Sequence, residues 1–211
     1  MNAAVAPMHP FQPSEAPAIV LASGSVTRRR LLEDAGLVFE TRAAAVDEES
    51  IKQASQAEGV SPDETALVLA ELKASRVRIA GALVIGADQI LTCDGRWFDK
   101  PRDRAGARVQ LQALRGKTHT LHTAMTCLRD GQVIWHHFEA PALRMREFSD
   151  EFLEVYLDQE MPGILGSVGA YRLEGIGAQL FDKITGDHTA ILGLPMLSLL
   201  GFLRQHGALM K

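Results

Sequence analysis

The chain has 211 residues, of which 46% are apolar and 23% are charged, and its formal net charge is −4. This composition is typical of a soluble globular protein with one domain, or two closely joined lobes, around a hydrophobic core. No apolar run approaches the roughly 18 residues of a membrane span, so a membrane protein is not expected. The negative net charge disfavours non-specific binding to nucleic acid, although a local basic cluster could still hold an anion.

The N-terminal segment and the two cysteines bear on the expected cellular location. Residues 1–17 are rich in Ala and Pro and lack the basic and apolar segments of a secretory signal. We expect a flexible arm over residues 1–17 and a single domain over residues 18–211. The two cysteines, Cys93 and Cys127, are too few for a disulfide framework. Two reduced thiols and a cytoplasmic location are therefore expected.

The predicted elements alternate between strands and helices in the first half of the chain, and hairpins enter later. In chain order we expect a strand at 18–22, a helix at 27–35, a strand at 37–45, a helix at 61–79, a strand at 82–92, a helix at 103–114, strands at 117–128 and 132–145, a helix at 149–159, a strand at 179–184 and a helix at 195–207. This order predicts an α/β fold in which a mixed, twisted β-sheet is flanked by helices.

Local signals mark several of these boundaries. Ser61 is a helix cap because Pro62 follows in the first turn and acidic residues come next, at the positive end of the helix dipole. The pairs Asp94-Gly95 and Asp130-Gly131 are both typical of tight hairpin turns. Each pair therefore predicts that the strands on its two sides lie antiparallel.

The first candidate for chemistry is the segment Ser23-Gly24-Ser25-Val26-Thr27-Arg28-Arg29, between a predicted strand and a predicted helix. A helix N-terminus offers free N–H groups and partial positive charge, and the serines and arginines add donors, so this segment could hold phosphate. The alternative is an ordinary capped helix with its arginines in solvent. A Walker P-loop is excluded because the Gly-Lys-Ser/Thr ending is absent.

The second candidate is Asp88, which interrupts the most apolar predicted strand. A carboxylate buried there needs a partner or a metal, because burying it bare costs several kcal/mol. The alternative is an acid at a strand end that points into solvent, but apolar residues on both sides favour a functional acid. Taken alone, Asp47-Glu48-Glu49 is typical of a solvated helix cap, and Asp99-Lys100-Pro101 of a surface turn.

The seven histidines do not predict a zinc site. His119 and His122 lie three positions apart in a predicted strand, so their side chains face opposite sides of the sheet. Neither a complete dinucleotide-binding glycine fingerprint nor a nucleophile elbow is present.

Eight short motifs together resemble, in chain order, the landmarks of the Maf family, and the match runs from about residue 19 to the last predicted helix. They are Leu21-Ala-Ser-Gly-Ser-Val-Thr-Arg-Arg-Arg-Leu-Leu32, Val46-Asp-Glu48, Ala70-Glu-Leu-Lys73-Ala, Gly86-Ala-Asp88-Gln89, Lys100-Pro101, Leu114-Arg-Gly-Lys-Thr-His119, Gly169-Ala-Tyr-Arg-Leu-Glu-Gly175 and Ile191-Leu-Gly-Leu-Pro195. The order of the motifs is more specific than any single one of them.

The resemblance implies a two-lobed, Maf/ITPase-like architecture around a central cleft, frequent homodimers, and hydrolysis of a nucleoside triphosphate to a monophosphate and pyrophosphate with Mg²⁺ or Mn²⁺. Carried over motif by motif, the expected site contains Ser23, Ser25, Thr27, Arg28 and Lys73 for the phosphates, Asp88, Glu48 and Lys100 for catalysis, and Gln89 and Glu174 for the base. Glu48 and Asp88 would serve the metal and the attacking water, with Asp88 as the proton acceptor. Hard divalent cations and carboxylate ligands suit phosphate chemistry.

The resemblance also bears on the substrate. The 7-methyl-GTP pyrophosphatase branch has Gln after the central acid and Glu in the later glycine-rich motif, as Gln89 and Glu174 stand here, whereas the dTTP and UTP branch has Thr and Gln. The chain departs from the family with Val26 in place of the usual Pro, and from the branch with Thr27 where an aromatic residue often stands. The alternatives are a dTTP/UTP-type or other house-cleaning pyrophosphatase, and a non-catalytic, nucleotide-binding regulator of cell division.

Overall fold

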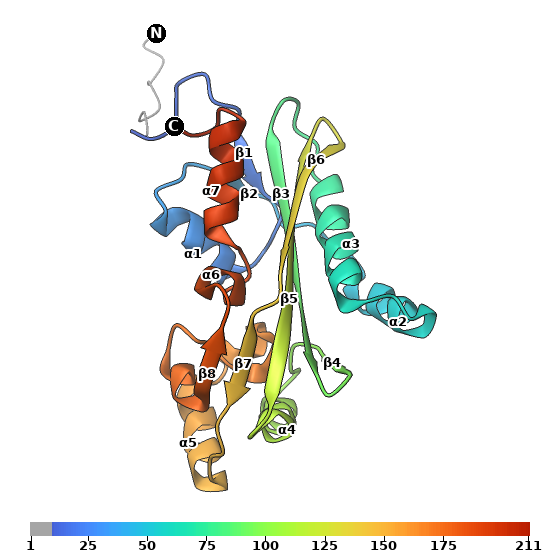
Figure 1. Ribbon diagram of the computed structural model, residues 1–211, viewed down its shortest axis with the longest axis vertical. Coiled ribbons are helices and arrows are strands. Elements are labelled where there is room, and N and C mark those ends of the chain that lie inside the picture. Colours follow the sequence, from blue (N-terminus) through green and yellow to red (C-terminus); the bar gives the residue numbers. More distant parts are fainter. Residues whose placement is uncertain (1–9) are drawn as a thin grey trace.

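The sheet is the centre of the computed structural model, which describes residues 10–211 (Figure 1). Its eight strands are β1 (Ile19–Leu21), β2 (Glu40–Thr41), β3 (Leu83–Cys93), β4 (Arg96–Phe98), β5 (Thr118–Arg129), β6 (Gln132–Glu139), β7 (Ala142–Met145) and β8 (Phe181–Thr185). The order is β2-β1-β3-β5-β7-β8, with β4 paired to β3 and β6 paired to β5. The first pairs, β1 with β2 and β1 with β3, are parallel and the others are antiparallel. The predicted mixed sheet is confirmed.

Helices cover both faces of this sheet. They are α1 (Val26–Asp34), α2 (Glu48–Glu58), α3 (Pro62–Ser75), α4 (Arg104–Leu114), α5 (Asp150–Glu160), α6 (His188–Ile191) and α7 (Met196–Gln205), with short 3-10 turns at Gly163–Gly166, Val168–Ala170 and Ile176–Leu180. In Figure 1, α2 and α3 lie on one side of the long central strands, and α1 and α7 lie on the other.

The two longest strands, β3 and β5, run through both lobes of the molecule (Figure 1). The upper lobe is built on the first half of β3, with β1, α1 and α7 packed around Ile85, Leu199 and Phe202. The lower lobe is built on the second half of β3, with α4, α5 and β7 packed around Leu91 and Leu111. The middle of β3 therefore lies at the junction of the two lobes.

A glycine allows α3 to approach β3 closely. A Cβ atom added to Gly86 would lie 2.0 Å from the carbonyl oxygen of Ala70 and 3.0 Å from the Cβ of Ala74. Any side chain at this position of β3 would push α3 away from the sheet. Gly86 thus sets the spacing between two elements that both carry candidate site residues, Lys73 and Asp88.

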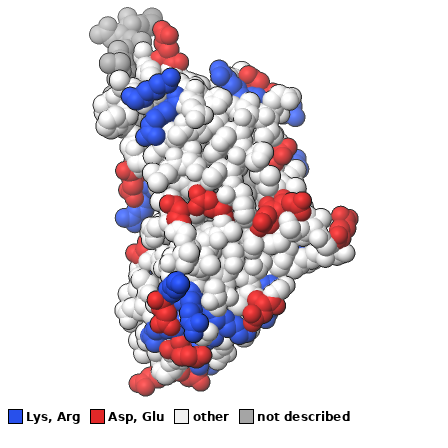
Figure 2. Space-filling view, in the orientation of Figure 1, with Lys and Arg blue, Asp and Glu red and all other residues white. Residues whose placement is uncertain are grey.

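Ion pairs join the helices of the lower lobe at its surface. Arg104 lies 3.1 Å from a carboxylate oxygen of Glu154 and 2.6 Å from one of Asp158, and Arg115 lies 2.6 Å from one of Asp150. In Figure 2, basic and acidic side chains accordingly intermingle at this end of the molecule. These ion pairs link α4 to α5.

Four predicted elements differ from those observed. The helix expected at 61–79 ends at Ser75, with Arg76 as its C-cap. The strand expected at 37–45 is reduced to β2, which pairs only with the short strand β1. The strand expected at 132–145 divides into β6 and β7 at Pro141, because proline has no N–H to donate to a sheet. The strand expected at 179–184 begins only at Phe181, since a 3-10 turn precedes it.

The first described residues are fixed to the upper lobe. The Gln12 side chain donates to the Val38 carbonyl and accepts from the Val38 N–H, while the Met210 N–H donates to the Phe11 carbonyl. The rest of the predicted arm, residues 1–9, lies outside the described residues. Across residues 10–211, no helix is long and apolar enough to cross a membrane.

Candidate active site

A cleft of about 1130 Å³ lies where the lobes meet, and all ten predicted site residues line it. They are Ser23, Ser25, Thr27, Arg28, Glu48, Lys73, Asp88, Gln89, Lys100 and Glu174. These residues come from α1, α2, α3, β3 and three loops, so the fold brings together positions that are up to 151 apart in the chain. Their roles remain predictions, but their proximity is an observation.

The centre of the cleft is an ion-pair cluster of three side chains. The Lys73 ammonium lies 2.6 Å from Oε1 of Glu48 and 2.5 Å from Oδ1 of Asp88. Glu48 begins α2, where Asp47 caps the helix by accepting from Ser50 N–H, and Lys73 comes from the last turn of α3. Lys73 and Asp88 are buried, whereas Glu48 is half-buried. One cation thus joins both candidate catalytic acids.

Asp88 has one oxygen without a partner. Its Oδ2 atom is buried and makes no hydrogen bond within residues 10–211. Leaving a buried polar atom unpaired costs roughly 1–3 kcal/mol, and more if it is charged, so Oδ2 is suited to interact with a bound ligand or water. The predicted functional role of Asp88, in the middle of a buried strand, agrees with this placement.

The charges of the cleft act on one another. Burial by itself raises the pKa of Glu48, but the charge and hydrogen bond of Lys73, and the charges of Lys52 and Lys100, outweigh it and lower the pKa below its usual value. Removal from water lowers the pKa of Lys100; Glu48 opposes this effect, and Arg28 and Lys73 add to it. Lys100 thus lies within electrostatic reach of the cluster, and part of the residue is still exposed to solvent.

The predicted phosphate segment connects β1 to α1. The Ser25 hydroxyl accepts from the Arg28 N–H as the N-cap of α1, and the Ser23 hydroxyl accepts from the Ser25 N–H and from the Arg28 guanidinium. Val26 and Thr27 begin the helix, so their N–H groups have no partner within it. A helix N-terminus of this kind can bind a phosphate oxygen.

Arg28 and Gln89 are more tightly bound to the protein than the sequence predicts. The buried Arg28 donates to the carbonyls of Gly193, at 3.0 Å, and Ala87, at 2.8 Å. The Gln89 amide nitrogen donates to the Thr123 hydroxyl and to the carbonyls of residues 190 and 191. Only part of each side chain is left for a ligand: for Gln89, the carbonyl oxygen.

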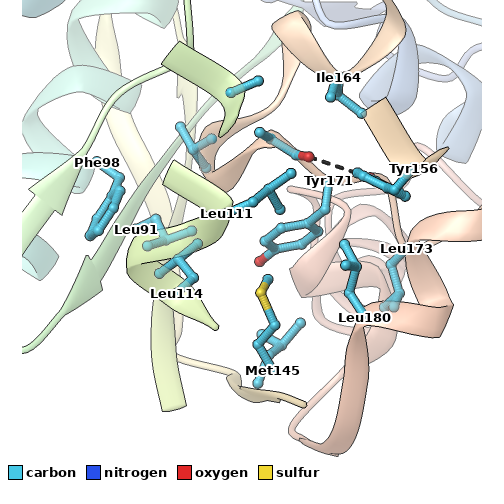
Figure 3. Close-up of a cluster of buried hydrophobic side chains, with 14 of the residues drawn as sticks. Leu91, Phe98, Leu111, Leu114, Met145, Tyr156, Ile164, Tyr171, Leu173 and Leu180 are labelled. Atoms are coloured by element: carbon cyan, nitrogen blue, oxygen red, sulfur yellow. Dashed lines mark hydrogen bonds between the residues drawn. The ribbon is translucent and has the colours of Figure 1, made fainter. Parts of the chain in front are cut away.

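The loop that carries Glu174 is fixed by the core of the lower lobe. Tyr171 lies among Leu111, Met145 and Leu180 in this core, and the Tyr156 hydroxyl donates to the Ala170 carbonyl (Figure 3). Glu174 itself is exposed and lines the cleft. The packed core of the lower lobe therefore supports the loop that presents the Glu174 carboxylate to the cleft.

The histidines are separated, as their spacing predicts. His119 is buried against the Tyr171 hydroxyl, whereas His122 contacts Asp63 and Thr92. Within residues 10–211, no group of three or more His, Cys, Asp or Glu side chains is arranged to hold a metal ion by itself.

Lys52 is one of several charged residues that line the cleft without having been predicted from the sequence. Lys52 is buried in α2, lines the cleft and bonds to Asp99 at 3.0 Å. Its spacing of four positions from Glu48 places both side chains on one face of a helix, and this signal could have identified it.

Comparison with known proteins gives consistent results. A family profile described as Maf-like protein matches residues 18–206. The chain is 57% identical to a nucleoside triphosphate pyrophosphatase of Paramagnetospirillum magneticum, over 90% of this chain and 99% of the relative. It is 54% identical to a nucleoside triphosphate pyrophosphatase of Granulibacter bethesdensis, over 90% and 98%. It is 46% identical to a 7-methyl-GTP pyrophosphatase of Rhizobium meliloti, over 92% and 98%.

Proposed function

Since the chain belongs to the family of Maf-like proteins, we propose that it is a nucleoside triphosphate pyrophosphatase whose active site is the cleft around Asp88. In this reaction a water oxygen forms a bond to the α-phosphorus, and the bond from that phosphorus to the bridging oxygen of the β-phosphate breaks. The products are a nucleoside monophosphate and pyrophosphate. The observation that carries the proposal is the Glu48–Lys73–Asp88 ion-pair cluster in the cleft, in which Lys73 and Asp88 are buried.

Asp88 is the proton acceptor in this proposal. Its Oδ1 is held by Lys73, and its Oδ2 has no partner within the described residues, so Oδ2 is the atom free to take a proton from the attacking water. A carboxylate that orients and deprotonates water contributes about 10²–10⁴-fold to a reaction rate. Lys73 keeps this carboxylate in one orientation.

The carboxylates also fit a divalent cation. Glu48 and Asp88 meet at the same lysine. The Glu48 oxygen that Lys73 does not use would hold the cation, and Asp88 would serve the water beside it. Magnesium typically takes one or two protein carboxylates and completes its shell with substrate phosphates and water, so a cage of three acids is not required. When bound, Mg²⁺ or Mn²⁺ would supply Lewis-acid stabilisation of the phosphate oxygens.

The remaining positive groups would bind the triphosphate. The N-terminus of α1 offers backbone N–H groups, and Lys100 adds a charge that is not tied to a carboxylate of the described chain. Such preorganised donors and charges stabilise the negative charge that develops on the transferred group. An acidic protein can thus bind an acidic substrate because its positive charge is local.

For the base, we favour a guanine of the 7-methyl-GTP kind. The donors of Gln89 are used by the protein, so its carbonyl oxygen and the Glu174 carboxylate would present acceptors to the base. The Watson–Crick edge of guanine offers two adjacent N–H donors, whereas uracil and thymine offer one. A cationic methylated guanine would gain further from the Glu174 charge. We retain the cytoplasmic location and the homodimer as predictions from the sequence.

Pyrophosphate release from 7-methyl-GTP, GTP, UTP and dTTP tests the proposal, with Mg²⁺ or Mn²⁺ and with chelator. We expect metal-dependent release with a monophosphate product, and 7-methyl-GTP as the best substrate. A clear preference for UTP or dTTP would contradict the guanine assignment but would still support the proposed reaction. No release from any nucleotide would favour the alternative of a non-catalytic regulator.

A further inference from the structure

Lys52 occupies an unusual position for a lysine. Its side chain is only 11% exposed, whereas that of its partner Asp99 is 68% exposed. Nζ of Lys52 lies 3.0 Å from Oδ1 of Asp99. Lysines are rarely buried unless they are paired. Because the Lys52 side chain is buried, its ammonium has little freedom to move, and it restrains the exposed carboxylate of Asp99.

Asp99 directly precedes Lys100, and its backbone is held as well. The Gln110 amide of α4 donates to the Asp99 carbonyl at 2.7 Å, and the same side chain accepts from the Gly169 N–H at 3.1 Å. Lys52 therefore ties the segment to α2, and Gln110 ties it to α4 and to the loop before Tyr171. These bonds connect both walls of the cleft through one residue.

Lys100 itself has no such partner. Its ammonium makes no hydrogen bond or ion pair with residues 10–211, although it lies within electrostatic reach of Glu48 and Asp88. Its placement over the cleft thus depends on its backbone, which is fixed by Asp99 on one side and by the buried Pro101 on the other. A second pair, Arg102 with Glu49, is largely exposed at 3.7 Å and contributes little.

We infer that Lys52 is a positioning residue, which through its ion pair with Asp99 holds the segment that aims Lys100 at the phosphates. The inference rests on the proposed function, because the group positioned is one that this function uses. A direct contact of Lys52 with phosphate is the competing role, but its ammonium is already paired with Asp99. Displacement of a catalytic group by about 1 Å can cost 10²-fold in rate, so a loose segment would be felt.

The test removes the charge of Asp99, the ion-pair partner, and leaves Lys52 in place. Asp99→Asn should lower kcat by about 10-fold with a smaller change in KM, because Lys100 is still present but is less well aimed. Asp99→Glu should restore most of the rate. In a Lys100→Met background, Asp99→Asn should cause no further loss, since the residue it positions is gone. Pyrophosphate release under single-turnover conditions gives these rates, and thermal unfolding checks the fold.

Asp94→Asn is the matched control. It breaks the Lys117–Asp94 ion pair, in which the two atoms lie 2.9 Å apart. Like Asp99, Asp94 directly follows a strand, but it does not line the cleft. This variant should keep the wild-type rate.

Four results would overturn the inference. An active wild type whose rate is unaffected by Asp99→Asn removes it and leaves the proposed function intact. If Asp99→Asn lowers the rate by the same factor in the Lys100→Met background, Asp99 does not act through Lys100. A loss in Lys52→Met without one in Asp99→Asn assigns Lys52 to the phosphate itself. If the wild type releases no pyrophosphate from any nucleotide, the proposed function fails and the inference fails with it.

Discussion

The ammonium nitrogen of Lys73 lies 2.5 Å from Oδ1 of Asp88, although one residue belongs to α3 and the other to β3. The two side chains are 10% and 4% exposed, so each supplies the opposite charge that the burial of the other requires. This contact orients the Asp88 carboxylate and leaves Oδ2 as its free atom. The chemistry of the cleft thus depends on the spacing between a helix and a strand.

Asp88→Asn should abolish most of the turnover without unfolding the protein. The amide has the shape of the carboxylate and can still accept from Lys73, but it cannot take a proton from water. We expect kcat/KM to fall by at least about 100-fold and the melting temperature to change by a few degrees at most. Pyrophosphate release and thermal unfolding measure the two effects. A variant with near-normal turnover would show that Asp88 is not the essential acid.

Gly86→Ala should destabilise the protein and weaken its activity together. The new Cβ would lie 2.0 Å from the Ala70 carbonyl, so α3 must move and Lys73 must move with it. We expect a loss of about 2 kcal/mol or more in urea unfolding. Gly201→Ala is the matched control, because nothing lies within 4 Å of its added Cβ in α7. It should stabilise by up to about 1 kcal/mol with unchanged turnover. Equal stabilities of the two variants would contradict the close-approach argument.

Local patterns predicted those features that depend on neighbours in the chain. The helix start at Ser61 is present as a full capping box with Glu64, and Asp94 and Asp130 lie in hairpin turns. The prediction that Asp88 is a functional acid followed from the cost of burying an acid in an apolar strand, and Asp88 is indeed buried. Helix α2 was not predicted, because Glu48–Glu58 contains few large apolar residues.

The contacts that local patterns could not predict are those between distant residues. Arg28 donates to a carbonyl 165 positions away, and Gln89 to one 101 positions away, so their use within the protein depends on the final packing. The Lys52–Asp99 pair spans 47 positions and joins two elements whose relative placement the sequence does not specify. The resemblance to the Maf family identified the residues of the cleft, whereas the hydrogen bonds and ion pairs of each side chain required the structure.

Glu174→Gln should change the preference among bases more than the rate with the best alternative base. The substitution removes the charge that would attract a cationic, N–H-rich base but keeps the size of the side chain. A hydrogen bond to a charged group is worth roughly 1.5–3 kcal/mol, so the ratio of kcat/KM for 7-methyl-GTP over UTP should fall by about 10-fold or more. Glu71→Gln, on an exposed position of α3 outside the cleft, should leave this ratio unchanged. An unchanged ranking of substrates in Glu174→Gln would remove Glu174 from base recognition.

His119 should make the protein less stable in mild acid. Burial lowers the pKa of His119 to about 4, since its side chain is 1% exposed and its Nδ1 has no partner within the described residues. The unfolded chain, with a pKa of about 6.5 at this residue, binds the proton first as the pH falls. The contribution of neutral His119 is thus fully present above about pH 6.5 and is lost progressively down to about pH 4.

Urea unfolding at pH 7.5 and pH 5 measures this loss. Relative to His119→Gln, which does not titrate, the wild type should lose about 2 kcal/mol between these values. His136→Gln, at an exposed histidine, should keep the wild-type dependence on pH. If His119→Gln loses as much stability as the wild type over this interval, the buried imidazole is not the group responsible for the acid sensitivity.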